Sequence, residues 1–202
     1  MPRLSAEFYL REEVTVIARE LLGQLLITEK NGNRTSGMIV ETEAYRGPED
    51  KASHAYNNRR TPRTEVMFGP GGHAYVYLCY GIHHLFNVVT GPADRPHAVL
   101  IRAIEPVEGL EIMMARRNRT LSKRLTSGPG LVGEALALRA HDTGASLLSG
   151  EMVWIERQPP LLDAAILATP RIGVDYAEEC AAWPWRFSIR QNEWVSGKKI
   201  AG

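Results

Sequence analysis

The sequence predicts an α+β fold in which helices pack around a mostly antiparallel β-sheet. Two observations support this prediction. The chain is rich in apolar runs of strand length, and only a few segments show helical periodicity. Turn signals join some of these runs closely enough for hairpins, which pair antiparallel strands. The 202 residues contain no internal repeat, linker or low-complexity tract, so we expect a single domain over residues 1–202 with a substantial core.

The N-terminal region predicts one helix and one hairpin. Residues 12–22 carry apolar side chains at helical spacing, and Gly23 follows as a stop signal. The apolar positions are Val14, Ile17, Ala18 and Leu21. Residues 24–28 then predict a strand, Asn31-Gly32 a hairpin turn, and residues 36–45 the partner strand.

A long polar segment and three more strands follow. Residues 46–72 show no sustained periodicity, and loops of this length inside compact domains are usually functional or disordered. Strands are predicted for residues 73–80, 83–90 and 97–104. The first two are joined tightly through Tyr80-Gly81-Ile82, which predicts a second hairpin.

The remaining chain predicts two helices and three short strands. Pro106 suits the first turn of a helix that continues through Leu110, Met113 and Met114. A second helix is expected after residues 126–130, with Leu131, Ala135 and Leu138 on one side. The short strands are predicted at residues 152–156, 171–174 and 186–190.

Composition excludes few functions. The chain has 44% hydrophobic and 23% charged residues, as ordinary globular proteins do, and no apolar run reaches the roughly 18 residues that span a bilayer. Residues 1–13 lack the apolar core of a signal peptide. Cys79 and Cys180 lie far apart, which disfavours a disulfide framework and favours a reducing compartment. We therefore expect a cytoplasmic protein without membrane contact.

Two glutamates occur together in the predicted strand of residues 36–45. Alternation along a strand places Glu41, Glu43 and Tyr45 on one face, with neighbours about 7 Å apart. Such charges most often face solvent. Two carboxylates at this spacing can also flank a glycosidic bond as acid and base, and the long loop directly after Tyr45 favours a site. The pattern alone leaves both interpretations open.

Tyrosines are concentrated between residues 45 and 80. Five of the seven tyrosines lie there, namely Tyr45, Tyr56, Tyr75, Tyr77 and Tyr80. Aromatic residues are common in strands, so packing is the ordinary explanation. Alternatively, Tyr75 and Tyr77 form one face on which a flat heterocycle could stack, and Tyr80 at the hairpin tip could insert into a partner.

Positive charge is segregated although the net charge is only +1. One acid-free segment of nine residues contains Arg116, Arg117, Arg119, Lys123 and Arg124, and the long loop adds Arg59, Arg60 and Arg63. Each cluster alone is most often a solvated face, but two clusters in a nearly neutral protein favour a surface for a phosphate backbone. Ser127 and Gly128 open the second predicted helix with free backbone N–H groups, which suits one phosphate.

The sequence contains no typical metal or nucleotide motif. The six histidines show no HExxH or comparable spacing, and glycine-rich nucleotide loops and nucleophile elbows are absent. We expect neither a metal nor a cofactor.

Five segments together resemble the alkyladenine (3-methyladenine) DNA glycosylase family. They are GMIVETEAYRGPEDKASHA, GPGGHAYVYLCYGIHHLFNVVT, AVLIRAIEP, TSGPGLVGEALAL and WVSG, in this order. The likeness extends from about Leu4 to Gly197 and is weakest between His141 and Thr169. It implies a curved sheet with a protruding β-hairpin. It also implies a monomer that acts on double-stranded DNA containing damaged purines, such as 3-methyladenine, 7-methylguanine, hypoxanthine and ethenoadenine.

The resemblance also implies roles for individual residues. In this family a damaged nucleotide is flipped out of the duplex and its N-glycosidic bond is hydrolysed. Glu43 would be the general base that activates water, and Arg102 and the backbone carbonyl of His54 would hold that water. Tyr45 would stack on one side of the base, with His54 and Tyr77 on the other.

Further roles concern DNA and selectivity. Asn87 would lie at the pocket edge near the purine 2-position, and Tyr80 would fill the vacated stack as a wedge. Glu41 receives no chemical role. An N-alkylated purine is already positive and leaves without much acid assistance, so one carboxylate suffices. The resemblance assigns no lysine a catalytic role as a Schiff-base former, so strand cleavage is not expected. The phosphate contacts are assigned to Arg59, Arg63, Arg116, Arg117, Arg119, Ser127 and Gly128.

Two other functions compete with this one. A module that flips bases without hydrolysing them would share the tyrosines and the basic segments, and only Glu43 beside Arg102 distinguishes it. A hydrolase of free nucleosides would use both Glu41 and Glu43. The basic segments and the tip tyrosine argue against the hydrolase, because a nucleoside has no backbone to bind.

Overall fold

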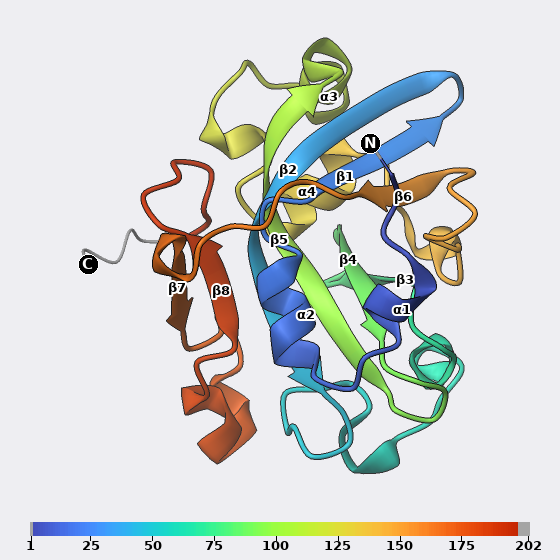
Figure 1. The fold of residues 1–202 in the computed structure, drawn as a ribbon. Coiled ribbons are helices and arrows are strands. Elements are labelled where there is room, and N and C mark those ends of the chain that lie inside the picture. Colours follow the sequence, from blue (N-terminus) through green and yellow to red (C-terminus); the bar gives the residue numbers. More distant parts are fainter. Residues whose placement is uncertain (1, 198–202) are drawn as a thin grey trace.

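One antiparallel sheet forms the centre of the molecule. The computed structural model describes residues 2–197, and within them eight strands form one sheet whose pairings are all antiparallel. The main path is β3-β4-β5-β2-β1-β6, and β8 pairs with β2 and β7 (Figure 1). The strands are β1 (Leu25–Lys30), β2 (Asn33–Arg46), β3 (Ala74–Cys79), β4 (His83–Thr90), β5 (His97–Glu108), β6 (Val153–Glu156), β7 (Ile166–Thr169) and β8 (Arg186–Ile189). The predicted α+β class is confirmed.

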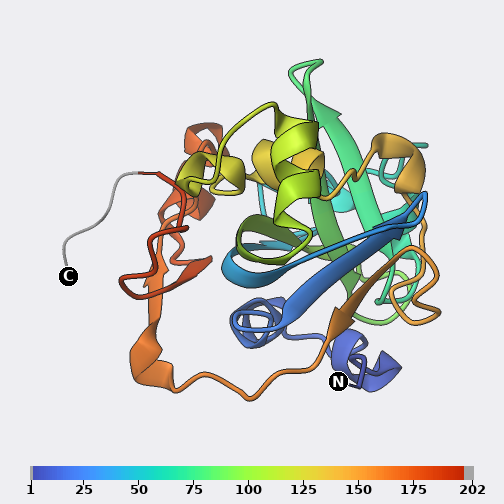
Figure 2. The same cartoon turned by 90° about the horizontal axis from the view of Figure 1, so that it is seen from above.

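Helices cover the sheet on both faces. The α-helices are α1 (Ala6–Tyr9), α2 (Val14–Glu20), α3 (Leu110–Arg117) and α4 (Pro129–Ala135). Helix α2 packs against β2 and β5, and α4 packs against β4 and β5 on the opposite side (Figure 2). Short 3₁₀ helices occupy the connections: η1 (Tyr56–Asn58), η2 (Glu65–Phe68), η3 (Lys123–Leu125), η4 (Ala140–Asp142), η5 (Asp163–Ala165) and η6 (Asp175–Ala182). None of the helices within residues 2–197 is long and apolar enough to cross a membrane.

The second half of β2 is paired on both edges. Its first half pairs with β1, and residues Glu41–Glu43 pair with β5 on one edge and β8 on the other. The register between β2 and β5 shifts on both sides of Glu41, and such irregularities bend a strand and increase its twist. The side chains alternate as expected, because the Thr42 hydroxyl donates to the Ala18 carbonyl of α2 on the face opposite the two glutamates.

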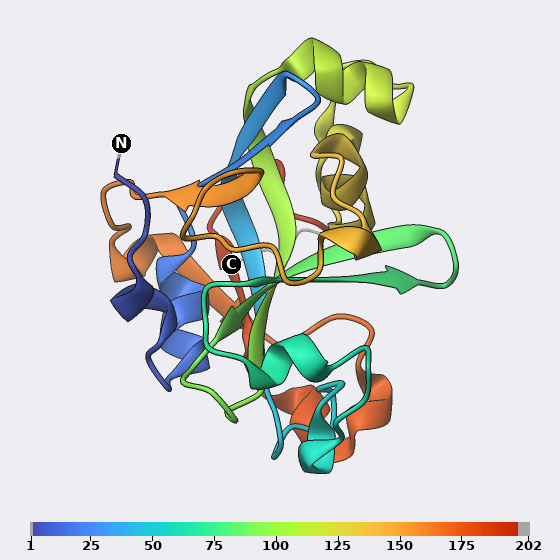
Figure 3. The ribbon, with the colours of Figure 1, turned by 90° about the vertical axis from the view of Figure 1, so that its right-hand side faces the viewer.

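Two tight hairpins follow the predicted turns. Asn31 and Gly32 have φ values of +54° and +73°, and Tyr80 and Gly81 have φ values of +51° and +71°. Positive φ at both central residues defines the turn whose twist matches that of paired strands. The β3–β4 hairpin projects from the body of the molecule (Figure 3). The protruding hairpin implied by the resemblance is therefore present.

Strand β5 is longer than predicted. The sequence places a helix start at Pro106, but β5 continues to Glu108 and α3 begins at Leu110, so that prediction is wrong. Proline is tolerated here because β4 pairs with β5 only as far as Leu100. Beyond an isolated bridge between Ala103 and Ser127, the described strands leave β5 paired with β2 on one edge. A residue without an N–H fits such a one-sided position.

The C-terminal third contains a second correction. Residues 171–174 are not a strand, and the strand that precedes them is β7, which the sequence did not predict. Gly173 has a φ of +75°, which ends extended structure, and the Arg171 side chain is buried among polar partners. Strands β6 and β8 lie where they were predicted.

Candidate active site

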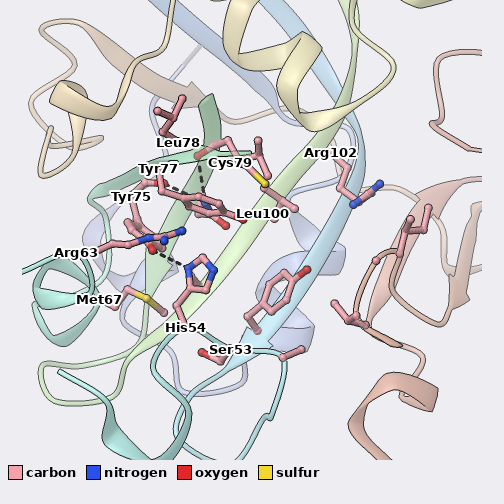
Figure 4. Close-up of a pocket in the computed structure, with 18 of the residues that line it drawn as sticks. Ser53, His54, Arg63, Met67, Tyr75, Tyr77, Leu78, Cys79, Leu100 and Arg102 are labelled. Carbon is pink, nitrogen blue, oxygen red and sulfur yellow. Dashed lines mark hydrogen bonds between the residues drawn. The ribbon is translucent and has the colours of Figure 1, made fainter. Parts of the chain in front are cut away.

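A cavity of about 420 Å³ opens beside the base of the β3–β4 hairpin. Its lining comes from β3, β4 and β5, the end of β2, the long loop and the segment around Ile172. Figure 4 shows Arg63, His54, Tyr75 and Tyr77 gathered on one side, with Arg102 on the other. The sequence-predicted residues that line it are Tyr45, His54, Arg63, Tyr77, Tyr80, Asn87 and Arg102.

Glu43 lies directly behind the cavity lining and is fully buried. Its carboxylate accepts three polar contacts. The Tyr45 hydroxyl lies 2.7 Å from Oε2, Arg102 Nη1 lies 3.2 Å from Oε2, and the Ile172 backbone N–H donates to Oε1 over 2.8 Å. All three donors belong to residues that line the cavity. The carboxylate is therefore compensated, held in one orientation and separated from the cavity only by its own partners.

Glu41 is also fully buried, but of its partners only Arg102 lines the cavity. Arg186 Nε lies 2.5 Å and Arg102 Nε 3.2 Å from its Oε1, and the Ser196 backbone N–H donates to Oε2 over 2.7 Å. Arg102 thus bridges the two carboxylates with different nitrogens. The sequence suggested a solvated face or a catalytic pair, and the structure instead shows one carboxylate behind the cavity and one inside the fold.

Tyr45 forms one wall of the cavity. Burial and the neighbouring Glu43 carboxylate raise its pKa well above the ordinary value, so the phenol stays protonated and can donate to Glu43. The Arg171 guanidinium packs on the Tyr45 ring, 4.8 Å from its centroid, and forms a buried bidentate ion pair with Asp50. The sequence gave no sign of this support, because Arg171 lies in a segment predicted to be a strand.

The opposite wall is a cluster of three rings. His54 Nδ1 and the Tyr75 hydroxyl share a hydrogen bond of 2.7 Å, and the His54 and Tyr77 rings meet edge to face at 4.7 Å between centroids. Burial lowers the pKa of His54 to about 4, with further contributions from the positive charges of Arg63 and Arg59. His54 is therefore neutral near pH 7.

Asn87 lies on the cavity floor in β4 and is buried. Its side-chain amide donates to the backbone carbonyl of Tyr75 over 3.0 Å, which fixes the side chain against β3. The position is consistent with the predicted pocket edge.

Tyr80 occupies the hairpin tip and is 91% exposed. Its φ of +51° is uncommon for a tyrosine, since a bulky residue in the left-handed region costs roughly 1–2 kcal/mol. Asparagine or glycine would be the stable choice for such a turn. A strained and exposed aromatic at a tip indicates a role outside the fold.

The predicted basic surface divides into two kinds of residue. Arg116 donates to Thr35 and to the Ala135 carbonyl, and Arg117 pairs with Glu134, so both side chains hold α3 against its neighbours. Exposed positions of the same cluster are Arg119, Lys123 and Arg124. Ser127 and Gly128 are half-buried before α4, as predicted for a helix start.

The three arginines of the long loop, predicted to face a phosphate backbone, lie in different surroundings. Arg59 is exposed, and Arg60 pairs with Glu65 and Asp94. Arg63 turns toward the cavity and lies 4.7 Å from the Tyr77 ring centroid. Among residues 2–197 no group of three or more potential ligand side chains is placed to bind a metal ion.

Comparisons with known proteins agree with these observations. Residues 7–193 match the family model described as methylpurine-DNA glycosylase. A Chlamydia abortus protein is 52% identical over 188 residues, which are 92% of this chain and 97% of that protein. A Bacillus cereus protein is 49% identical and covers 90% of this chain and 93% of its own length. A Chlamydia pneumoniae protein is 48% identical and covers 98% and 100%. All three are named as proposed 3-methyladenine DNA glycosylases.

Proposed function

The chain belongs to the methylpurine-DNA glycosylase family, and from this premise we propose that it releases damaged purines from double-stranded DNA. DNA is thus its partner. The proposed substrates are alkylated or deaminated purine nucleotides that contain 3-methyladenine, 7-methylguanine, hypoxanthine or ethenoadenine. The observation that carries the proposal is the buried Glu43 carboxylate behind a cavity walled by aromatic rings on two sides.

Glu43 acts as the general base in this proposal. A water molecule enters beside Arg102, whose 3.2 Å contact is the longest that the carboxylate makes, and is held there by Arg102 and the His54 backbone carbonyl. Glu43 takes a proton from the water as its oxygen bonds to C1′ of the sugar. The bond between C1′ and the purine nitrogen breaks, and the purine leaves with the bonding electrons. The negative carboxylate also stabilises the positive charge that develops on the sugar.

The aromatic walls bind the extruded base. Tyr45 stacks on one face, and His54 with Tyr77 covers the other. Electron-rich rings favour a cationic base by about 1 kcal/mol or more in a desolvated site. Asn87 disfavours the exocyclic amine at the purine 2-position, which guanine has and adenine and hypoxanthine lack. Undamaged guanine is rejected on this ground, whereas 7-methylguanine is still released because its positive charge favours binding and departure. Selection among bases also follows the ease of extrusion, since damaged pairs unstack at lower cost.

The hairpin tip supports extrusion, and no lysine is among the described residues that line the cavity. Tyr80 fills the gap in the stack as the base leaves it. A lyase reaction needs a neutral amine that attacks the sugar. Lys51, near the cavity, forms ion pairs with Glu178 and Glu179, whose hydrogen bonds raise its pKa, so it stays protonated. The enzyme is therefore proposed to hydrolyse the bond without cutting the strand.

The two competing functions are less consistent with the geometry. A nucleoside hydrolase that uses both carboxylates needs Glu41 at the substrate, but Glu41 is fully buried between Arg102, Arg186 and Ser196. A non-catalytic flipping module has no need of a compensated carboxylate behind its base pocket.

A gel assay tests the proposal. Duplexes that each carry one hypoxanthine, ethenoadenine or 7-methylguanine are incubated with the protein and then divided into samples with and without hot alkali. The expected result is strand breakage only after alkali, which shows an abasic site formed by hydrolysis. Breakage without alkali would show a lyase, and tight lesion binding without any base release would support the non-catalytic module.

A further inference from the structure

Arg63 lines the proposed base pocket, whereas the sequence analysis assigned it to the phosphate contacts. The guanidinium carbon is 4.7 Å from the Tyr77 ring centroid. Burial raises the pKa of the Tyr75 phenol, and the positive charge of Arg63 acts in the opposite direction. Figure 4 shows the guanidinium beside both tyrosines and His54. Two aromatic neighbours therefore hold the positive charge at the wall against which the base is proposed to stack.

This charge lacks an acidic partner. None of the ion pairs formed by residues 2–197 includes Arg63. The other wall differs, because Arg171 behind Tyr45 is neutralised by its bidentate contact with Asp50. The two walls of one cavity thus present different electrostatic fields to a bound base.

The pKa of His54 indicates the electrostatic effect of Arg63 on this wall of the cavity. Burial is the main cause of its low pKa of about 4, and Arg63 contributes more than Arg59 to the remaining lowering. A positive charge that disfavours a second positive charge on His54 also disfavours one on a base in contact with His54 and Tyr77.

We propose that Arg63 is a specificity-determining residue that shifts the enzyme from positively charged lesions toward neutral ones. The inference rests on the proposed function. Cationic 7-methylguanine is attracted by the tyrosine faces and by Glu43 but is repelled by Arg63, whereas neutral hypoxanthine loses nothing to this repulsion. At separations of about 5–8 Å in a partly hydrated pocket, the repulsion reduces the relative excision of a cationic base by about three- to tenfold.

Two Arg63 substitutions separate charge from contact. Arg63→Gln removes the charge and keeps a planar polar group, whereas Arg63→Lys keeps the charge and removes the planar group. Arg63 is an exposed residue by its overall accessible surface, so both variants are expected to fold. Arg59→Gln is the matched control, because it removes a nearby loop charge that lines no part of the base cavity.

The measurement is single-turnover base release from two duplexes, one with 7-methylguanine and one with hypoxanthine, at saturating enzyme. We expect the ratio of the two rates to rise about three- to tenfold in Arg63→Gln and to stay near the parent ratio in Arg63→Lys and Arg59→Gln. NMR titration of His54 gives an independent readout, in which Arg63→Gln raises its pKa.

The outcomes distinguish this inference from the proposed function. If the parent releases both bases and Arg63→Gln keeps the parent ratio, Arg63 does not determine specificity. An equal loss for both lesions in Arg63→Gln and Arg59→Gln would make Arg63 a phosphate contact and overturn the inference. A parent protein that releases neither base would refute the proposed function itself.

Discussion

The buried groups behind the cavity and the groups that face its opening differ in how far their charges and contacts are satisfied within the protein. The buried Glu41, Glu43 and Arg102 each have their charge compensated by a fixed partner. At the rim, Tyr80 is 91% exposed in a strained turn, and Arg63 in the cavity wall has no acidic partner among residues 2–197. Groups with compensated charges keep one geometry, as a reaction requires. Side chains whose charge or surface has no partner within the protein are available to contact a ligand. The difference predicts separable effects on base release, stability and DNA binding.

The largest effect is expected for Glu43. Glu43→Gln keeps the shape of the side chain but cannot accept a proton from water, so base release should fall by about 10²-fold or more. Binding to lesion duplex should stay within about twofold, because the walls and the rim are unchanged. Single-turnover release and fluorescence anisotropy measure the two quantities. Glu29→Gln, an exposed acid in β1, is the control for loss of a carboxylate.

A parallel loss of binding and base release would contradict the distinction between the buried and the exposed groups. If Glu43→Gln weakens lesion binding as strongly as it slows base release, the carboxylate is part of the binding surface. The buried groups would then not form a catalytic region separate from the binding surface.

The next largest effect is expected for Glu41, on stability. Glu41→Gln leaves Arg102 and Arg186 buried with less compensation, so the free energy of unfolding should fall by about 3 kcal/mol. Base release should fall much less than in Glu43→Gln, through a small displacement of Arg102. Urea unfolding and the release assay test this, with Glu29→Gln again as control. Should Glu41→Gln slow release more than Glu43→Gln, both carboxylates are catalytic.

The effect expected for Tyr80, at the rim of the cavity, is smaller and concerns the extrusion of the base from the duplex. Unstacking a base costs a few kcal/mol, and Tyr80→Ser removes the ring that would fill the gap. Lesion binding should weaken by about tenfold, and the loss should shrink when the lesion lies opposite an abasic gap. The fluorescence of ethenoadenine, which is quenched in the stack, reports extrusion directly. Tyr56→Ser, at another exposed tyrosine in η1, is the control. Full extrusion by Tyr80→Ser would show that Tyr80 is no wedge.

Local sequence patterns predicted the fold where neighbouring residues decide the structure. Asn31-Gly32 specifies its turn by the φ preferences of both residues, Gly81 favours the second turn although Tyr80 does not, and alternation along β2 placed Glu41 and Glu43 on one face. The prediction of a helix start at Pro106 failed because proline is tolerated where β4 no longer pairs with β5, and this pairing is not visible in the local sequence.

The sequence predicted those residues of the site that belong to the family motifs. The motif residues Tyr45, His54, Tyr77 and Asn87 do meet at one cavity. Their supporting contacts were not predictable, because Arg171 and the Ile172 N–H reach β2 from a segment more than 120 residues away in sequence. A run of arginines likewise does not reveal which of them find acidic or carbonyl partners inside the fold.

The smallest effect separates two arginines of the basic cluster. Arg119 is exposed, whereas Arg116 donates to Thr35 and to the Ala135 carbonyl. A phosphate contact releases counterions, so Arg119→Gln should lower the slope of log affinity against log salt by about 0.9 and weaken binding a few-fold. Damaged and undamaged duplex should be affected alike, since phosphate contacts carry no base information. Arg116→Gln should instead lower the free energy of unfolding by about 1–3 kcal/mol, because it leaves buried acceptors without a donor. Measuring both variants by salt-dependent anisotropy and urea unfolding tests the division. A full change in salt slope for Arg116→Gln, with none for Arg119→Gln, would mean that the internal contacts of Arg116 give way to DNA and that exposure does not identify the binding residues.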